Sequence, residues 1–191
     1  QLGYEKRDLL VSHVEEARDE QEAAKEQFQS ALDRFIAVTQ FEGGELESRY
    51  RQLQSSYEAS AEQAKAVTKE IDDVESVGEA LFDEWESELD QYQSAELRRS
   101  SERQLRQTRS RYEQLLEAMR EAESRMPPVL AAFHDQVLFL KHNLNAQAIA
   151  SLEESAEGIQ EDVQRLIREM EQSINEANVF IEQMGKGQGK V

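Results

Sequence analysis

The sequence contains three histidines, His13, His134 and His142, which are its best candidates for binding a transition metal. His134 and His142 stand eight residues apart, so they share a face if that segment is helical. Metal sites on helices usually need ligands three or four residues apart, or ligands that converge from several helices. No Glu-x-x-His pair occurs, which disfavours a di-iron bundle of the usual kind. We therefore expect no metal and no other cofactor.

Neighbouring acids are frequent, as at Glu15-Glu16, Asp72-Asp73 and Glu153-Glu154. Catalytic carboxylates need a pocket that shifts their pKa, whereas acids on highly charged helices are typical of a solvated face. The sequence contains no Gly-x-Gly-x-x-Gly, phosphate-binding loop or nucleophile elbow. It also has no cysteine, which excludes disulfides, thiolate metal sites and cysteine nucleophiles. We expect no catalytic residues and no enzymatic activity.

One run of basic residues stands out in an acidic chain. Residues 94–128 carry a net charge of +2, whereas residues 1–45, 46–93 and 129–191 carry −6, −9 and −5. Six arginines fall within fourteen residues of this block: Arg98, Arg99, Arg103, Arg106, Arg109 and Arg111. Five acids precede the turn expected near residue 94: Asp83, Glu84, Glu86, Glu88 and Asp90. The charges either fix the register of an antiparallel hairpin, or form a basic tip for anionic lipid or an acidic partner.

Four aromatic residues also gather at this end of the hairpin: Phe82, Trp85, Tyr92 and Tyr112. Packing in the core is one explanation. An exposed aromatic grip on a partner is the other.

Apolar residues recur at spacings of four and three along four segments, which is the heptad pattern of coiled-coil helices. The first segment, residues 5–40, has Leu10, Val14, Ala17, Gln21, Ala24, Phe28, Ala31, Phe35 and Val38. The second has Leu46, Tyr50, Leu53, Tyr57, Ser60, Ala64, Val67, Ile71, Val74, Gly78, Leu81 and Trp85. The third has Leu97, Ser101, Leu105, Thr108, Tyr112, Leu115, Met119, Ala122, Met126, Val129, Phe133, Val137, Leu140 and Leu144. The fourth has Leu152, Ala156, Ile159, Val163, Leu166, Met170, Ser173, Ala177, Ile181 and Met184.

The breaks between segments carry turn residues. Phe41-Glu42-Gly43-Gly44 predicts the first turn, and Gln93-Ser94 predicts the second, with a new helix cap. Pro127-Pro128 predicts a kink or a brief break, and the heptads continue in phase across it, which favours a kinked rod. We expect the stretch Leu138–Leu140 to be the most deeply buried, and a bend to follow at Asn143–Gln147.

The composition agrees with long helices. The chain has 191 residues, 40 acids, 22 bases and a net charge of −18, with two prolines. A disordered acidic chain is the alternative, and the heptads argue against it. This charge repels nucleic acid. No stretch approaches the ~20 apolar residues of a membrane span. The chain begins Gln1-Leu2-Gly3, and we expect a trimmed form from which any targeting segment has been lost.

Three longer runs carry a resemblance. Leu81–Glu86, Leu97–Arg106 and Phe139–Leu152 are similar to a family of uncharacterised bacterial envelope proteins, a domain of unknown function numbered twenty-nine fifty-nine. The resemblance covers about residues 4–184. It implies a periplasmic protein, lipid-anchored in its full-length form through an N-terminal lipoprotein signal that is absent here. The family supplies no activity and no catalytic residues.

We therefore expect an all-α fold, an elongated antiparallel coiled-coil bundle of about four long helices, in which the second and third form a long hairpin. Residues 1–4 would be an N-terminal remnant, 5–184 one elongated helical domain and 185–191 a flexible tail. The expected function is a non-enzymatic structural or interaction protein of the bacterial cell envelope, presenting a long helical surface to a protein partner. The alternative is a BAR-like membrane-binding or membrane-shaping homodimer that uses the arginine-rich hairpin.

Overall fold

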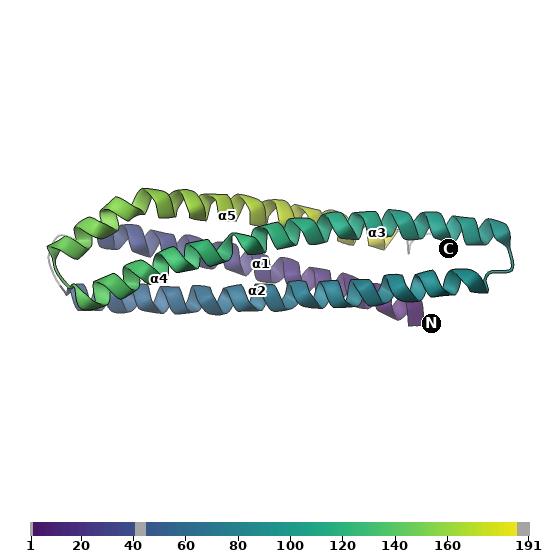
Figure 1. The fold of residues 1–191 in the computed structure, drawn as a ribbon, viewed down its shortest axis with the longest axis horizontal. Coiled ribbons are helices and arrows are strands. Elements are labelled where there is room, and N and C mark those ends of the chain that lie inside the picture. The colour runs from purple at the N-terminus through teal and green to yellow at the C-terminus, as the bar shows by residue number, and fades with distance from the viewer. Residues whose placement is uncertain (1, 41–44, 187–191) are drawn as a thin grey trace.

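The heptad segments become five α-helices in the computed structural model, which describes residues 2–40 and 45–186 (Figure 1). The helices are α1 (Leu2–Thr39), α2 (Leu46–Glu88), α3 (Ala95–Ser124), α4 (Met126–His142) and α5 (Ala146–Lys186). A short 3-10 helix, η1 (Leu89–Gln91), follows α2. No strand occurs within the described residues, so the predicted all-α class is confirmed.

The helices form an antiparallel four-rod bundle, because α3 and α4 follow one another along a single rod (Figure 1). The helix α1 packs against α2 and α5, and the α3–α4 rod packs against the same two helices from the other side. Each rod thus has two neighbours, as in an up-down bundle with short connections. The core runs along the axis, where the heptad faces meet.

The predicted heptad residues account for most of this core. All nine of the first segment are buried, including the polar Gln21. Gln21 accepts a hydrogen bond from Ser173 Oγ on α5, with the Ser173 Oγ to Gln21 Oε1 distance at 2.7 Å. This hydrogen bond between helices reduces the cost of placing Gln21 and Ser173 in the core, although Gln21 Nε2 has no partner among the described residues.

The turn at residue 94 forms as predicted. The Ser94 side chain caps α3 by accepting a hydrogen bond from the Leu97 backbone N–H at 3.2 Å. At the α4–α5 connection, Asn145 Oδ1 accepts from the Ala148 N–H at 3.1 Å. The predicted turn Phe41–Gly44 and the tail residues 187–191 lie outside the described residues.

Helix limits differ slightly from the prediction. The helix α1 begins at Leu2, before the expected start near Glu5, and α5 continues through Gly185 to Lys186. Helix ends are weakly determined, because a glycine inside a helix costs only about 1 kcal/mol relative to alanine.

The proline pair interrupts the third rod for one residue. The helix α3 ends at Ser124, Arg125 caps both helices, and α4 starts at Met126 with the prolines in its first turn. A proline lacks an N–H, but the first-turn N–H groups have no acceptor within the helix, so little is lost there. Met126 and Val129 are both buried, and the seam stays in phase across the break.

Four apolar residues are more exposed than the sequence predicted. Leu138 and Phe139 are 47% and 39% exposed, so the expected deep burial of Leu138–Leu140 is wrong except for Leu140. Consecutive residues of a helix point in directions about 100° apart, so three in a row cannot all face the core. Leu97 and Leu144 are also exposed, because they lie at the ends of their rods next to turns.

Candidate functional site

The α2–α3 hairpin projects beyond the start of α1 and the end of α5 (Figure 1). An ion pair marks the end of the four-rod body, with Lys6 Nζ on α1 2.6 Å from Glu84 Oε2 on α2. Arg7 lies over the Trp85 ring at the same level, 5.6 Å from its centroid. Trp85 Nε1 also donates to Ser101 Oγ across the hairpin at 2.8 Å. We call residues 86–100 the projecting tip.

Two of the six predicted arginines hold the hairpin together. Arg98 Nη2 lies 3.1 Å from Asp90 Oδ1, and Arg109 Nη2 lies 3.4 Å from Glu86 Oε2. Arg109 also stacks over the Phe82 ring, 5.3 Å from its centroid. These contacts are those expected of charges that fix the register of α2 against α3.

Three other arginines point away from the bundle. Arg99, Arg103 and Arg106 are exposed, and their spacings of four and three place them on one face of α3. That face is opposite the buried Ser101 and Leu105. Within the described part of the chain, none of the three makes an ion pair or a side-chain hydrogen bond. We call these three residues the arginine stripe.

The sixth arginine lies at a different place. Arg111 is exposed and lines a pocket of about 200 Å³ at the end of the body, together with Arg7 of α1. The remaining polar lining comes from the amides of Gln104, Gln107 and Gln183 and the hydroxyl of Thr108. The fold therefore divides the predicted group of six into two register arginines, the stripe of three and one pocket residue.

The predicted aromatic cluster forms only in part. Phe82 and Tyr112 pack with their ring centroids 5.2 Å apart, and Trp85 lies half-buried against the core. Tyr92 is instead 43% exposed, because it lies in the turn itself. The tip thus presents Tyr92 and Leu97 to solvent, with Leu97 on the side of α3 opposite the arginine stripe.

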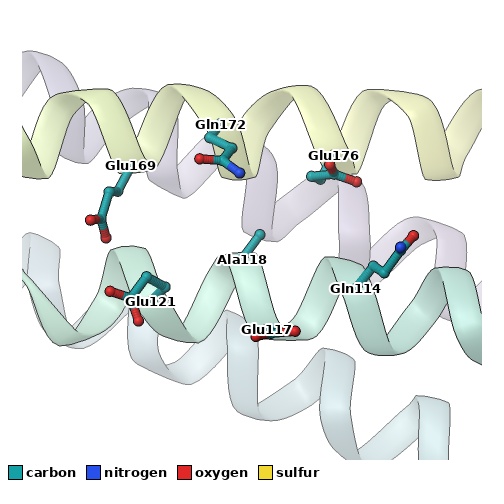
Figure 2. Close-up of a pocket in the computed structure, with 7 residues that line it drawn as sticks. All are labelled: Gln114, Glu117, Ala118, Glu121, Glu169, Gln172 and Glu176. Atoms are coloured by element: carbon teal, nitrogen blue, oxygen red, sulfur yellow. The ribbon is translucent and has the colours of Figure 1, made fainter.

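An acidic groove of about 410 Å³ runs between α3 and α5 (Figure 2). Its lining consists of Gln114, Glu117, Ala118, Glu121, Glu169, Gln172 and Glu176. Arg125 neutralises one end, with its guanidinium 3.1 Å from Glu121 and 3.2 Å from Glu169. The lining therefore offers carboxylates, amides and the methyl group of Ala118.

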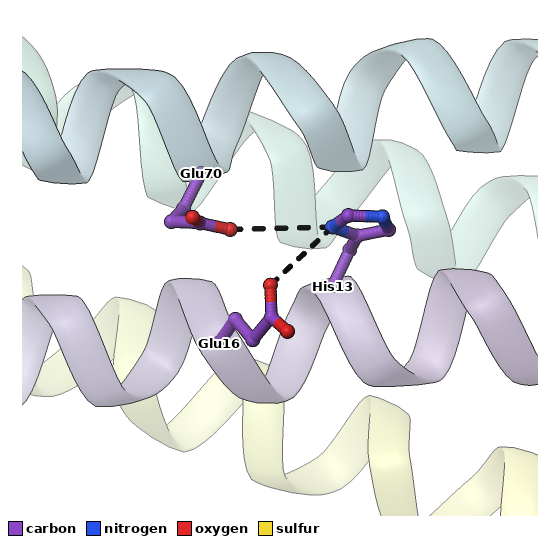
Figure 3. A group of neighbouring side chains, drawn as sticks. All are labelled: His13, Glu16 and Glu70. Carbon is purple, nitrogen blue, oxygen red and sulfur yellow. Dashed lines mark ion pairs between the residues drawn. The ribbon is translucent and has the colours of Figure 1, made fainter.

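A second cluster was not predicted from the sequence. His13 and Glu16 of α1 meet Glu70 of α2 (Figure 3). His13 Nδ1 lies 3.6 Å from Glu16 Oε2 and 4.0 Å from Glu70 Oε2. The available signal was the three-residue spacing from His13 to Glu16, the reverse order of the Glu-x-x-His pair considered above. Glu70 is brought in by the packing of α1 on α2, which the heptads do not specify.

The other two histidines stand apart. His134 is exposed and packs beside Tyr57, with ring centroids 5.2 Å apart. His142 is exposed in the last turn of α4. Among the described residues, neither His134 nor His142 belongs to a group of three side chains that could bind one metal ion.

The chain matches a known protein family. The family described as "Protein of unknown function (DUF2959)" matches residues 1–184, which is nearly the whole sequence. No curated protein matches the chain. The resemblance found in the three sequence runs is thereby confirmed, and the chain belongs to this family of proteins of unknown function.

Proposed function

We propose that the chain is a non-enzymatic interaction protein of the bacterial cell envelope, whose arginine stripe, which begins in the projecting tip and continues along α3, binds an acidic protein partner. The observation that carries this proposal is the stripe itself, three exposed arginines on one helix face that make no ion pair among the described residues of a chain with net charge −18. Three guanidinium groups in a row give this acidic chain a local positive surface that is complementary to an acidic partner.

Charge complementarity favours an acidic partner at this place. The guanidinium group forms paired hydrogen bonds with carboxylates, and three such groups on one helix face match a row of acids on a partner helix. The acidic walls of the body repel the same partner elsewhere, so contact is directed to the stripe. Tyr92 adds an exposed aromatic side chain at the turn of the tip.

The core and the surface pockets support a non-enzymatic role. The core consists mainly of heptad side chains. The groove between α3 and α5 and the pocket at Arg111 are lined mainly by acids, amides and basic groups. The envelope location rests on the resemblance of the three sequence runs. No described helix combines the length and the apolar character needed to cross a bilayer.

The test is a pull-down from envelope extract with three forms of the protein. The stripe variant is Arg99→Glu, Arg103→Glu and Arg106→Glu. The control variant makes the same charge change at three exposed bases elsewhere, as Lys141→Glu, Arg165→Glu and Arg168→Glu. We expect the wild type and the control to retain a stoichiometric acidic protein, and the stripe variant to lose it.

Salt and lipid separate the proposal from its alternative. Binding through the stripe should weaken steeply between ~0.05 and ~0.5 M salt, because exposed charges are screened within a Debye length. Flotation with anionic liposomes, lost in the stripe variant, would favour the BAR-like membrane module instead. A partner held equally by the stripe variant would refute the arginine stripe as the binding surface.

A further inference from the structure

We infer that His13, Glu16 and Glu70 form a binding site for a divalent transition-metal ion of the zinc type, held between α1 and α2. Each residue offers one ligand atom, and the three atoms lie within 4.8 Å of one another (Figure 3). His13 and Glu16 share one face of α1, three residues apart, and Glu70 reaches them from the antiparallel neighbour α2.

The distances are close to those of a bound ion. Zinc binds His nitrogen and carboxylate oxygen at about 2.0–2.2 Å with tetrahedral geometry, which places the ligand atoms about 3.4 Å apart. The two separations from His13 Nδ1, 3.6 Å to Glu16 and 4.0 Å to Glu70, are somewhat larger than this, and the third pair of ligand atoms lies within 4.8 Å. Rotation of the exposed Glu16 side chain brings it closer to both partners, and small torsional changes of the half-buried His13 and Glu70 close the remaining gap without moving a helix.

Two of the ligand atoms are buried and lack hydrogen-bond partners. His13 Nδ1 and Glu70 Oε2 have no hydrogen-bond partner among the described residues. The other carboxylate oxygen, Glu70 Oε1, lies 3.5 Å from Lys69 Nζ, which also binds Asp73 at 3.0 Å. A buried acceptor without a partner is costly, and a cation bound between these atoms would satisfy both.

The charges favour a cation over a neutral ligand. The ligand oxygens of Glu16 and Glu70 lie within 4.8 Å of each other. Two carboxylates held this close repel each other unless a proton or a cation lies between them. The imidazole nitrogen selects a transition metal, because Mg²⁺ and Ca²⁺ prefer all-oxygen sites. Three protein ligands leave a coordination position open to water or to a partner's side chain.

The experiment uses the whole chain, treated with chelator and then titrated with Zn²⁺ in a calorimeter and with Co²⁺ by visible absorption. We expect one Zn²⁺ per chain and the absorption bands of low-coordinate Co²⁺. His13→Gln and Glu70→Gln should each weaken binding at least tenfold. His142→Gln, at an exposed histidine outside the cluster, should leave binding unchanged.

Other outcomes would overturn the site. Zn²⁺ binding that survives His13→Gln, or that His142→Gln removes, would place the ion elsewhere on the acidic surface. Absence of binding by the wild type would also refute it. Circular dichroism of both ligand variants without metal shows whether they fold. Because binding to the folded state alone adds stability, Zn²⁺ should raise the melting temperature of the wild type but not of folded His13→Gln.

Discussion

At Gly78 the backbone of α2 makes room for an aromatic ring. A Cβ placed there would lie 2.3 Å from Tyr112 Cε2 and 2.7 Å from its hydroxyl oxygen. The ring cannot move away cheaply, because it packs on Phe82 and its hydroxyl donates to the Glu75 carbonyl at 3.2 Å. Gly78 is therefore a close-packing position between α2 and α3.

Replacing this glycine should destabilise the protein despite the helix preference of alanine. We expect Gly78→Ala to lower the free energy of unfolding by about 1–3 kcal/mol, because the extra methyl group overpacks the seam. Gly158→Ala is the matched control, since nothing lies within 4 Å of its added Cβ. It should raise stability by up to about 1 kcal/mol. Urea unfolding measures both, and equal effects at the two sites would refute the packing role of Gly78.

The same tyrosine makes stability depend on alkaline pH. Burial, and then the nearby acids, raise the pKa of Tyr112 from 10.0 to about 12. An acid whose pKa is raised in the folded state favours folding fully below its unfolded pKa, and that contribution is lost as pH rises through the folded pKa. Between pH 10 and 12 the wild type should lose roughly 1–2 kcal/mol through this group.

The Tyr112→Phe variant isolates this effect. It removes the ionisable hydroxyl and the hydrogen bond to Glu75, so it should be slightly less stable than the wild type at pH 8. Its stability should then fall less steeply from pH 10 to 12. Guanidinium unfolding at several pH values measures the difference, and parallel pH profiles of the two proteins would contradict the assignment.

Residues of this kind could not be predicted fully from one sequence. Gly78 stands at a heptad position of the second segment. The facing Tyr112 ring explains why a glycine occupies this position. Heptad spacing tells which side of a helix is buried, but not which residue of the next helix lies opposite. The cluster of His13, Glu16 and Glu70 escaped prediction for the same reason, since Glu70 lies on another helix.

At the scale of elements, Arg120 anchors α3 to α2. Its guanidinium lies 2.9 Å from Asp72 and 3.2 Å from Glu123, and it also pairs with Glu75. Burial acts to lower the pKa of Arg120, and the hydrogen bonds to Glu75, Asp72 and Glu123 outweigh it. The tip arginine Arg98 instead has two pairs in a more exposed setting.

These settings predict different costs. Arg120→Gln should lower the free energy of unfolding by about 1–2 kcal/mol, because several charged hydrogen bonds are lost together in a partly buried network. Arg98→Gln should cost less than about 0.5 kcal/mol, as is usual for exposed pairs. Chemical unfolding of both variants at low and high salt compares them. A larger loss for Arg98→Gln would contradict the ranking.

The elements themselves were largely predictable, because their signals are local. Heptad spacing located the helices, and the hydroxyl of Ser94 identified the start of α3. Pro127-Pro128 located the break in the third rod, although only the structure shows that it lasts one residue. The prediction failed at Leu138 and Phe139, where apolar composition was mistaken for burial. Composition reports how apolar a segment is, and periodicity reports which part of it faces the core.

For the whole molecule, folding decides which charges remain available. The sequence identifies a block of net charge +2 in an acidic chain, but it cannot divide the six arginines between structure and surface. In the folded hairpin, Arg98 pairs with Asp90 and Arg109 pairs with Glu86. The three arginines of the stripe remain exposed. The proposed partner surface is therefore a property of the bundle and of its unequal helix lengths.

The projecting tip should be separable from the body that carries it. The Lys6–Glu84 pair and the Trp85–Ser101 hydrogen bond lie at the boundary, and α1 continues only about one turn beyond Lys6, to Leu2 (Figure 1). A variant with a short glycine-rich loop in place of residues 87–99 keeps these contacts. Its main loss is the burial of Leu89, about 1–2 kcal/mol, so it should remain helical and unfold cooperatively.

This shortened protein tests the division of the molecule directly. Solution scattering should give a maximum dimension shorter by about 7 Å, because about five helical residues are removed from each rod at this end. The pull-down partner should bind much more weakly even though the body is folded, since Arg99 is deleted and only Arg103 and Arg106 of the stripe remain. Loss of cooperative unfolding would show that the tip is part of the core, and undiminished binding of the partner would show that the tip does not contribute to the binding surface.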